Sequence, residues 1–494
     1  MAIYTLLAGV ITSLCFYIYR RKLKAPFARL TEVGLPVFDT RDDDNGIVAV
    51  LEKAHKMHPN TPFALAVPGQ QLVVLPVSEI DTVKALPEEK LSIKKHHYNQ
   101  FLGEHSYMGT QADEFDHAMR NILARNTPAV LSSFTAEIEY AMSATIGNEL
   151  KDWSKVTPRS TMARIATILS GRSFVGLPLS RDEDWINATL SFTGLVSKAW
   201  MVLRFYPHFV RPLVAPFLSE VRSLEASKAH IARKLEALLH DRQQRNSDSK
   251  QPINEEPGGE LLEWFKQQYS HTPSVKELTR DQLLATFASI YNLSNALSYV
   301  IIDLAADASI VEELREELLN CLGPENLINK TNIMKLRKLD SFVRESQRMS
   351  PTSLVNIPRI VTASEGLKLT TGHTIPPGFL VMVRAQPINQ SSTLYPEPEK
   401  FDAFRFARLR EEPGNEMKFQ HTSTGTDNIN FGHGLWACPG RYFASAEIKV
   451  VVAHLVLNYE LRLPSGQKKP TPLYAGLAIF PDADAQIELR SRPN

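Results

Sequence analysis

The chain has 494 residues, of which 43% are hydrophobic and 22% charged, and its formal net charge is +1. These values are ordinary for a globular protein, and the near-neutral balance gives no whole-chain argument for binding nucleic acid. Three cysteines, Cys15, Cys321 and Cys438, are too few and too scattered for a disulfide framework or for a four-ligand zinc or iron–sulfur site, which suits a reducing compartment.

An almost uninterrupted apolar run covers residues 2–19, and the basic cluster Arg20 to Lys24 follows it at once. As a helix the run would span about 27 Å at about 1.5 Å per residue, close to a hydrocarbon core, and basic clusters stay on the cytosolic side. We therefore predict a membrane anchor with its basic flank in residues 1–24. A cleaved signal peptide is the alternative, but its positive charge would precede the apolar run. In the anchored orientation three sequons would stay unglycosylated: Asn187, Asn329 and Asn389.

A β-hairpin is predicted soon after the anchor, where apolar runs at 63–67 and 72–75 flank the turn signal Pro68-Gly69. Helical patterns then dominate to about residue 350. Residues 203–213 mix bulky apolar side chains with Arg and Pro. This segment is too short to span a bilayer, but it could dip into one or cover a substrate entrance.

A helix from about Arg280 to Ala308 is apolar almost all round, which predicts a buried central rod. Polar residues gather at its middle: Ser289, Tyr291, Asn292, Ser294 and Asn295. Buried polar groups need partners or a function. Beyond residue 350 the pattern predicts strands at 358–361, 366–369 and 379–383 and a last hairpin formed by 477–480 and 486–489.

Residues 431–441 read FGHGLWACPGR and place Cys438 in a Gly-rich loop, and residues 444–449 read as the start of a helix. A thiolate held by backbone turns can ligate a haem iron from one side. Loop glycines let backbone amides approach the sulfur, and the N-terminus of the following helix favours its negative charge.

This loop resembles the haem-binding signature of the cytochrome P450 family, F-x-x-G-x-(R/H)-x-C-x-G, in which Phe431, Gly434, Cys438 and Gly440 match. The resemblance implies that Cys438 is the axial ligand of the iron of haem b. Where the family has Arg or His, two residues before the ligand, this chain has Trp436, which offers only one indole N–H.

The resemblance also implies basic residues for the haem propionates. His117 and Arg120 lie three apart and are therefore expected on one face of a helix. Arg120 is the candidate propionate ligand and His117 the second, although Asp116 stands where the family often has Trp. Because of the Trp in the cysteine loop, Arg359 and His433 are further candidates.

The central helix resembles the family's distal helix, but Tyr291 stands at the usual acidic position and Asn292 at the usual Thr position. The acid–alcohol pair delivers protons to iron-bound oxygen, and an amide cannot release a proton at working pH. Either Asn292 orders a relaying water, helped by Ser289 or Tyr291, or the reaction depends less on O–O scission. A third reading is a purely local hydrogen bond in the helix.

Glu345 and Arg348 lie three apart and can pair on one helix. In the family this pair is buried and joins a later Arg, for which Arg405 matches. An Arg can satisfy a buried carboxylate in a bidentate manner. We therefore assign these three residues a structural role, which is to lock the loop that carries the thiolate.

The resemblance spans nearly the whole chain in the family's order and implies a mainly α fold with a smaller β-rich lobe. We predict a cytochrome P450 fold with an N-terminal transmembrane helix, divided into the anchor at 1–24 and a haem-thiolate catalytic domain at 25–494. The segment Pro439 to Ala444 suggests the membrane-anchored fungal type that acts in secondary metabolism.

The function implied is a monooxygenase that inserts one oxygen atom from O2 into a hydrophobic terpenoid, alkaloid or polyketide intermediate. The chain has no dinucleotide-binding fingerprint, so electrons from NADPH must arrive through a partner reductase, with cytochrome b5 as a further candidate. Arg441 and Lys449 are candidate docking residues for the reductase. The expected location is the endoplasmic reticulum membrane, with the catalytic domain in the cytosol.

Two alternatives remain. In the first, the same haem site catalyses desaturation, ring formation or rearrangement, as the presence of Asn292 suggests. In the second, the protein is a haem-binding scaffold without turnover.

Overall fold

The structure, a computed structural model, describes residues 33–40, 46–67, 70–147, 149–206, 209–248, 258–323 and 327–493. The predicted anchor, residues 1–24, lies outside these ranges. Within them, no single helix is long and apolar enough to cross a bilayer; α13 and α14 together meet the criteria of length and composition but are bent by 107° at their junction.

Helices form most of the described chain. The α-helices are α2 (Gly46–Met57), α3 (Ile80–Val83), α4 (Ile93–Gln100), α5 (Gly103–Ser106), α6 (Asp113–His117), α7 (Thr127–Ile146), α8 (Pro158–Phe174), α9 (Glu183–Leu203), α10 (Arg211–Val214), α11 (Ser219–Asp248), α12 (Glu260–Gln268), α13 (Val275–Ala306), α14 (Ala308–Leu322), α15 (Arg337–Met349), α16 (Gln386–Asn389), α17 (Arg405–Leu409) and α18 (Arg441–Asn458). Shorter turns are the 3₁₀ segments η1 (Val77–Glu79), η3 (Leu179–Arg181), η4 (Ala215–Phe217) and η5 (Gly434–Trp436), and the π-helical η2 (Ala118–Leu123).

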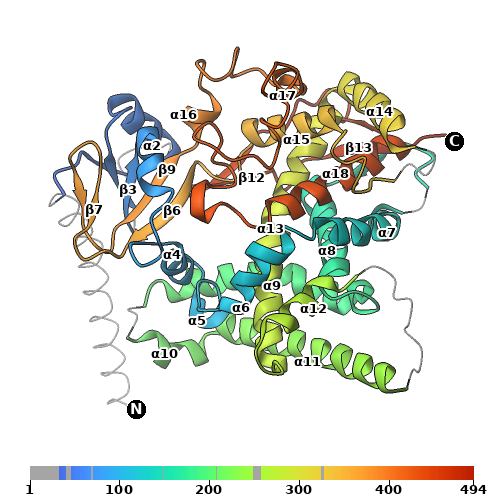
Figure 1. The fold of residues 1–494 in the computed structure, drawn as a ribbon, viewed down its shortest axis with the longest axis horizontal. Helices are drawn as coiled ribbons and strands as arrows, with labels where there is room; N and C mark the ends of the chain where they lie inside the picture. The colour runs from blue at the N-terminus through green and yellow to red at the C-terminus, as the bar shows by residue number, and fades with distance from the viewer. Residues whose placement is uncertain are drawn as a thin grey trace.

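The strands are β1 (Val37–Asp39), β2 (Phe63–Val67), β3 (Gln70–Leu75), β4 (Leu91–Ser92), β5 (Ser154–Val156), β6 (Val355–Val361), β7 (Leu367–Lys368), β8 (Thr374–Ile375), β9 (Leu380–Arg384), β10 (Tyr459–Arg462), β11 (Leu473–Ala475), β12 (Ala478–Phe480) and β13 (Ile487–Ser491). A six-stranded sheet has the order β1-β2-β3-β9-β6-β4, and β10-β13-β5 form a second sheet. The predicted mainly α fold with a small β-rich part is confirmed, with the large sheet at the left of Figure 1.

The predicted hairpin of β2 and β3 is confirmed, since the two strands pair antiparallel from Phe63 opposite Val74 to Val67 opposite Gln70. The predicted last hairpin is wrong in its partners. Strand β12 pairs with β11, and β13 instead pairs with β10 and β5. A strand's own side-chain pattern does not identify its neighbour, because pairing is decided by the packing of distant segments.

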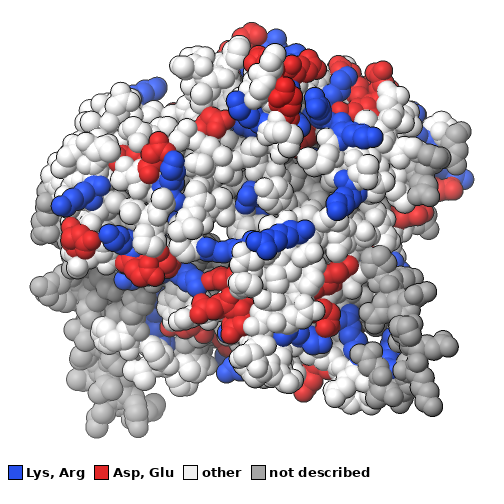
Figure 2. Space-filling view, in the orientation of Figure 1, with Lys and Arg blue, Asp and Glu red and all other residues white. Residues whose placement is uncertain are grey.

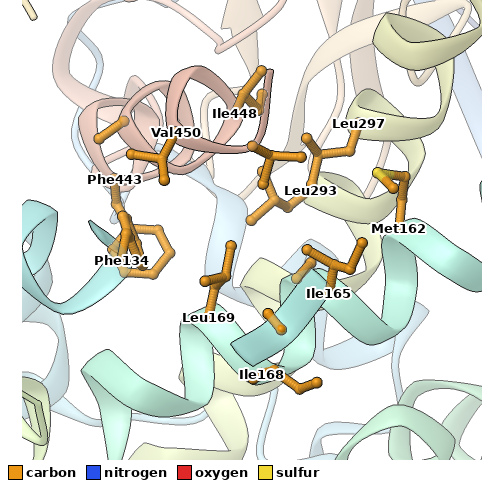
Figure 3. Packing of buried hydrophobic residues seen from close by; sticks show 14 of the residues in the cluster. Phe134, Met162, Ile165, Ile168, Leu169, Leu293, Leu297, Phe443, Ile448 and Val450 are labelled. Carbon is orange, nitrogen blue, oxygen red and sulfur yellow. The ribbon is translucent and has the colours of Figure 1, made fainter. Parts of the chain in front are cut away.

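Helix α13 is the central rod, and it crosses the middle of the molecule in Figure 1. It begins five residues before the predicted start because Ser274 and Glu277 form a capping box, in which each side chain accepts a hydrogen bond from the other residue's backbone N–H. Around this rod, Figure 3 shows Phe134 of α7, Leu169 of α8 and Phe443 of α18 packed close together. This interlocked core fixes α18, and therefore the loop immediately before it, against α13.

Candidate active site

The Cys438 loop is closed by its own backbone and by contacts with the backbone at the end of α3. The Cys438 amide donates to the Phe431 carbonyl at 2.7 Å, and the Gly432 amide donates to that of Ile429 at 2.8 Å. The Leu435 amide donates to the carbonyl of Lys84, at the end of α3, at 2.9 Å. Helix α18 then begins at Arg441, directly after the loop. The cysteine is thereby fixed at a helix N-terminus, as the sequence predicts.

Gly434 is required by two independent constraints. Its φ of +72° is a conformation that side chains strongly disfavour, and an added Cβ would lie 2.3 Å from the Lys84 carbonyl oxygen. Gly440 differs, because its φ is −82° and an added Cβ would only meet the Cys438 sulfur, at 4.0 Å. The two glycines of the signature therefore serve different purposes.

The surroundings of the Cys438 sulfur have opposing effects on the pKa of its thiol. Burial raises the pKa of the Cys438 thiol, whereas the backbone amides of Gly440 and Arg441 and the guanidinium of Arg441 act to lower it. The Arg441 side chain also donates to the Cys438 carbonyl at 2.9 Å. A thiol in such a site becomes a stable thiolate when a metal cation binds it.

Trp436 directs its indole N–H to the backbone rather than toward a ligand. The indole nitrogen donates to the Leu86 carbonyl at 3.1 Å, which uses its single donor. The guanidinium of Arg120 lies over the face of the ring, with its central carbon 4.1 Å from the ring centroid. The Trp therefore joins the cysteine loop to η2, from which Arg120 projects.

Arg359, on β6, is a buried cation that lacks full compensation. Its side chain is 2% exposed, and its Nε has no hydrogen-bond partner among the described residues. Burial lowers the pKa of Arg359 to about 10; the carboxylate of Glu88 opposes this shift and the charge of Arg120 adds to it. Arg120 and Arg359 therefore share one region of positive charge.

Two histidines that the sequence analysis missed lie in the same region. Burial lowers the pKa of His96 to about 3, with the charges of His97 and Arg359 adding to the shift. Burial and Arg359 lower the pKa of His97 to about 4. Both come from α4, which packs against β6. The pair His96-His97 in the sequence was the only available signal, and it has no characteristic spacing.

The other two candidate propionate ligands, His117 and His433, have polar partners of their own. His117 Nδ1 is 2.7 Å from the side-chain oxygen of Gln268 on α12. The shared face of His117 and Arg120 stays a prediction, because the chain passes into the π-helical η2 directly after His117 and the α-helical spacing rule does not apply there. His433 Nδ1 lies 3.2 Å from Thr424 Oγ1, and the charges that act on its pKa are those of Lys84, Asp81 and Asp427.

On α13, Asn292 is exposed, and its amide nitrogen donates to the Ala288 carbonyl one turn earlier, at 3.3 Å. The hydroxyl of Ser289 is likewise bonded to its own helix, at 2.8 Å from the Ala285 carbonyl oxygen. Tyr291 points to the C-terminal hairpin, where its ring lies 5.7 Å from that of Phe480. No carboxylic acid therefore takes the usual acidic position on this helix face.

Glu345, Arg348 and Arg405 meet in the interior. Arg348 binds both oxygens of Glu345 at 2.8 Å, and Arg405 Nε donates to the same carboxylate at 3.3 Å. Glu345 is fully buried. The two guanidiniums also bind backbone carbonyls of the following segment: Asn389, Pro396, Glu397, Pro398 and Lys400. The network thereby tethers residues 389–400 to α15.

This network reaches the cysteine loop through two asparagines. The side chain of Asn389 exchanges hydrogen bonds with that of Asn430 at 3.3–3.4 Å, and Asn430 directly precedes Phe431. On the other side, the Phe431 ring packs edge-on against His421, with centroids 5.1 Å apart. The residues assigned as structural from the sequence are therefore connected to the thiolate loop through polar contacts that the sequence did not indicate.

The donor set fits a haem. Cys438 is presented on a glycine-closed loop at a helix N-terminus, and Arg359 is a buried guanidinium with an unbonded Nε, close to a second cation. Two incompletely compensated cations at one place favour an anionic partner, and a haem carries two carboxylates. Cys438 would ligate the iron, and Arg120 and Arg359 would bind the carboxylates.

The cytochrome P450 family profile matches residues 134–488. The chain is 64% identical over 487 residues to cytochrome P450 monooxygenase gliF of Aspergillus fumigatus, covering 97% of this chain and 96% of that protein. It is 53% identical over 460 residues to cytochrome P450 monooxygenase ataF of Aspergillus terreus, covering 93% and 92%.

Solved structures show the same fold. The retinoic acid-bound cyanobacterial CYP120A1 aligns with a TM-score of 0.66 at 20% identity, covering 93% of this chain and 99% of that one. The cytochrome P450DA heme domain aligns with a TM-score of 0.71 at 15% identity, covering 93% and 98%. The length of the match and the identity to the fungal proteins show that this chain belongs to the cytochrome P450 family and is a cytochrome P450 monooxygenase.

Proposed function

We propose that the enzyme inserts one oxygen atom from O2 into a hydrophobic small molecule of fungal secondary metabolism, a terpenoid, alkaloid or polyketide intermediate. The observation that carries this proposal is the closed Cys438 loop, which presents one thiol at the N-terminus of α18. The high identity to two Aspergillus monooxygenases supports the fungal assignment. A scaffold without turnover would have no need of a thiol held on a hydrogen-bonded loop at a helix N-terminus.

When bound, haem supplies the activation of O2 and the oxidation of the substrate C–H bond. The chain's residues hold and orient the reactants. The Cys438 loop fixes the sulfur, and Arg120 and Arg359 bind the haem carboxylates. The C-terminal hairpin is held against the residue before β6, since the Leu477 carbonyl accepts from the amide of Leu354 at 2.9 Å. Apolar side chains there exclude water and favour a hydrophobic substrate.

The second candidate reaction is desaturation, ring formation or rearrangement at the same site. The observation that favours it is the bonding of the distal polar groups to their own helix. Asn292 donates to the Ala288 carbonyl, and Tyr291 faces Phe480. A site with no acid on this helix face delivers protons less directly, which favours a reaction that depends less on O–O scission.

Electrons are proposed to come from NADPH through a membrane-bound reductase, with cytochrome b5 as a second donor. Lys449 is not available for docking, since its Nζ lies 2.6 Å from Asp340 in the interior and the side chain is only 9% exposed. Arg441 is partly exposed. Acidic and basic side chains are interspersed over the face shown in Figure 2, and neither sign covers it.

We also propose that residues 1–24 anchor the protein in the endoplasmic reticulum membrane, with the catalytic domain in the cytosol. An exposed apolar stripe supports this proposal. Its members recur every four residues around α9, α10 and η4: Met201, Phe205, Phe209, Leu213 and Phe217, each 53–80% exposed. Exposed apolar patches of this kind mark interaction sites, and a second membrane contact would hide them from water. Helix α10 lies at the lower left of Figure 1.

The test of the proposed reaction begins with a fungal host that lacks only this protein, in which the accumulated intermediate is identified by mass. That intermediate is then incubated under ¹⁸O2 with NADPH, the purified enzyme and its reductase. The expected product gains one labelled oxygen atom. An oxidised product without the label supports the second candidate, and haem binding without any product supports the scaffold.

Cys438→Ala is the matched control for this experiment. It should abolish both turnover and the red-shifted Soret band that the carbonyl complex of the reduced protein shows when the axial ligand is a thiolate. Retention of that band in the variant would contradict the assignment of Cys438 as iron ligand.

A further inference from the structure

Trp436 occupies the position at which the haem-binding signature of the family has Arg or His, and its surroundings show what it does instead. Its indole N–H is bound to the Leu86 carbonyl, at 3.1 Å, so the ring is held in one orientation and offers no donor to a ligand. The remaining feature is the face of its π system. A tryptophan face attracts a cation more strongly than other aromatic rings.

Arg120 lies on that face. Its guanidinium carbon is 4.1 Å from the ring centroid, well within the range of a cation–π contact, and the side chain remains accessible. The planar guanidinium can stack on the ring and still direct N–H groups to a carboxylate at its edge. Stacking therefore restricts the position of Arg120 without using its hydrogen-bond donors.

The charge around Arg120 favours an anionic partner. Arg359 lies close enough that the charge of Arg120 lowers its pKa, and Glu88 is the acidic neighbour that opposes this shift. Glu88 is already engaged, because the amides of Lys94 and Ile93 donate to it at 2.9 and 3.2 Å and the Ser92 hydroxyl also binds it. Two guanidiniums consequently face the same region with little compensation from the described carboxylates.

From this arrangement we infer that Trp436 is a positioning residue: its ring holds Arg120 in the orientation that binds a haem carboxylate. The family signature has a basic residue two positions before the cysteine. In this chain Trp436 stands there, and its cation–π contact orients Arg120, which projects from η2. The same ring joins this cation to the thiolate loop, so the carboxylate clamp and the iron ligand are fixed relative to one another. The inference rests on the haem that membership of the cytochrome P450 family implies.

The experiment is a double-mutant cycle on the haem-loaded full-length protein, with Trp436→Ala, Arg120→Ala and the double variant. The readout is the rate at which haem is lost to excess apomyoglobin. A cation–π contact of ordinary strength corresponds to about a two- to thirtyfold faster loss in either single variant. If the ring acts through Arg120, the double variant should lose haem no faster than Arg120→Ala alone.

Further measurements separate positioning from general loosening of the loop. Trp436→Phe keeps a ring and should lose haem more slowly than Trp436→Ala. The haem reduction potential should fall in Trp436→Ala and Arg120→Ala alike, because an ionised carboxylate with less compensating charge favours ferric iron. The matched control is Trp153→Phe, since the guanidiniums of Arg462 and Arg490 stack on that ring at 3.9 and 4.8 Å, away from the cysteine loop.

Additive effects of the Trp436 and Arg120 changes on haem loss would overturn the inference, and so would an unchanged potential in both single variants. These outcomes differ from a failure of the proposed function. In that case the wild-type protein itself would bind no haem, or would bind it without the red-shifted Soret band of thiolate ligation.

Discussion

At the scale of single residues, the cysteine loop shows that two matching glycines can be under different constraints. Gly434 has a positive φ and lies against the Lys84 carbonyl, so it fixes the contact between the loop and the end of α3. Gly440 has an ordinary φ and faces only the cysteine sulfur. A side chain is therefore excluded from the first position by the protein itself, and at the second it would mainly affect what approaches the sulfur.

Gly434→Ala should strongly reduce the amount of haem-thiolate protein, because the new methyl group would lie 2.3 Å from a backbone oxygen at a strained φ. Strain of this kind costs about 1–3 kcal/mol before the steric overlap is included. Gly440→Ala should change stability by less than about 1 kcal/mol and act chiefly on the Soret spectrum. The measurements are the thermal midpoint and the carbonyl spectrum of the reduced protein. Equal loss of stability in the two variants would contradict this distinction.

At the scale of elements, the Glu345 network shows how a helix can control a loop that it does not carry. Helix α15 contributes Glu345 and Arg348, and Arg405 joins them from α17. The guanidiniums bind the backbone of the intervening segment. The side chain of Asn389 in that segment is hydrogen-bonded to Asn430, beside the cysteine loop. A buried ion pair contributes little net stability compared with an apolar replacement, so its value here is the fixed geometry of the segment.

Arg348→Ala should destabilise the protein by about 3–5 kcal/mol, the usual effect of removing one partner of a buried pair. The fraction of protein with thiolate-ligated haem should fall with it, because the carbonyls of Asn389, Pro398 and Lys400 lose their contacts with Arg348. Thermal unfolding and the ratio of haem to protein test both effects.

The matched control for Arg348→Ala is Lys400→Ala, which removes an ion pair with Glu397 whose two side chains are 66% and 70% exposed. Exposed pairs contribute about 0–1 kcal/mol. Similar losses of stability and of thiolate-ligated haem in the two variants would refute the proposed role of the buried network.

At the scale of the whole molecule, apolar side chains are exposed together in one region, the stripe that runs from Met201 to Phe217 around α10. These side chains are 53–80% exposed in the described part of the chain, and burying each Phe or Leu would contribute about 1.5–3 kcal/mol. A lipid surface is the partner that fits a predicted membrane protein. Such a contact would place the region around α10 against the bilayer, in addition to the tether that we propose for residues 1–24.

A variant that lacks residues 1–24 should therefore retain weak binding to phosphatidylcholine vesicles. Changing Phe209, Leu213 and Phe217 to Ser in this truncated protein should weaken that binding at least tenfold in a flotation assay. The matched control changes three exposed apolar residues from other regions to Ser: Leu319, Met334 and Met417.

Equal losses of vesicle binding in the two triple variants would show that the stripe is not the membrane contact. The orientation of the full-length chain is checked on Asn187 and Asn329, whose side chains are exposed. A mobility shift on endoglycosidase treatment would contradict a cytosolic catalytic domain.

The sequence by itself determined those features that depend on short-range chemistry. The spacing of Phe431, Gly434 and Cys438 identified the family, and the apolar pattern predicted the central helix, because both are properties of residues close together in the chain. The Glu345–Arg348 pair could be predicted for the same reason, since a spacing of three places two side chains together on any α-helix.

Only the tertiary structure decided which residues meet across long separations. His117 contacts Gln268 and Arg120 contacts Trp436, and β12 pairs with β11 rather than with β13. Neither outcome can be predicted from a local sequence pattern. The contact between Arg120 and Trp436 joins positions more than 300 residues apart and depends on how the helical body packs against the loop. Its physical basis, a cation on an aromatic face, exists only once that packing is complete.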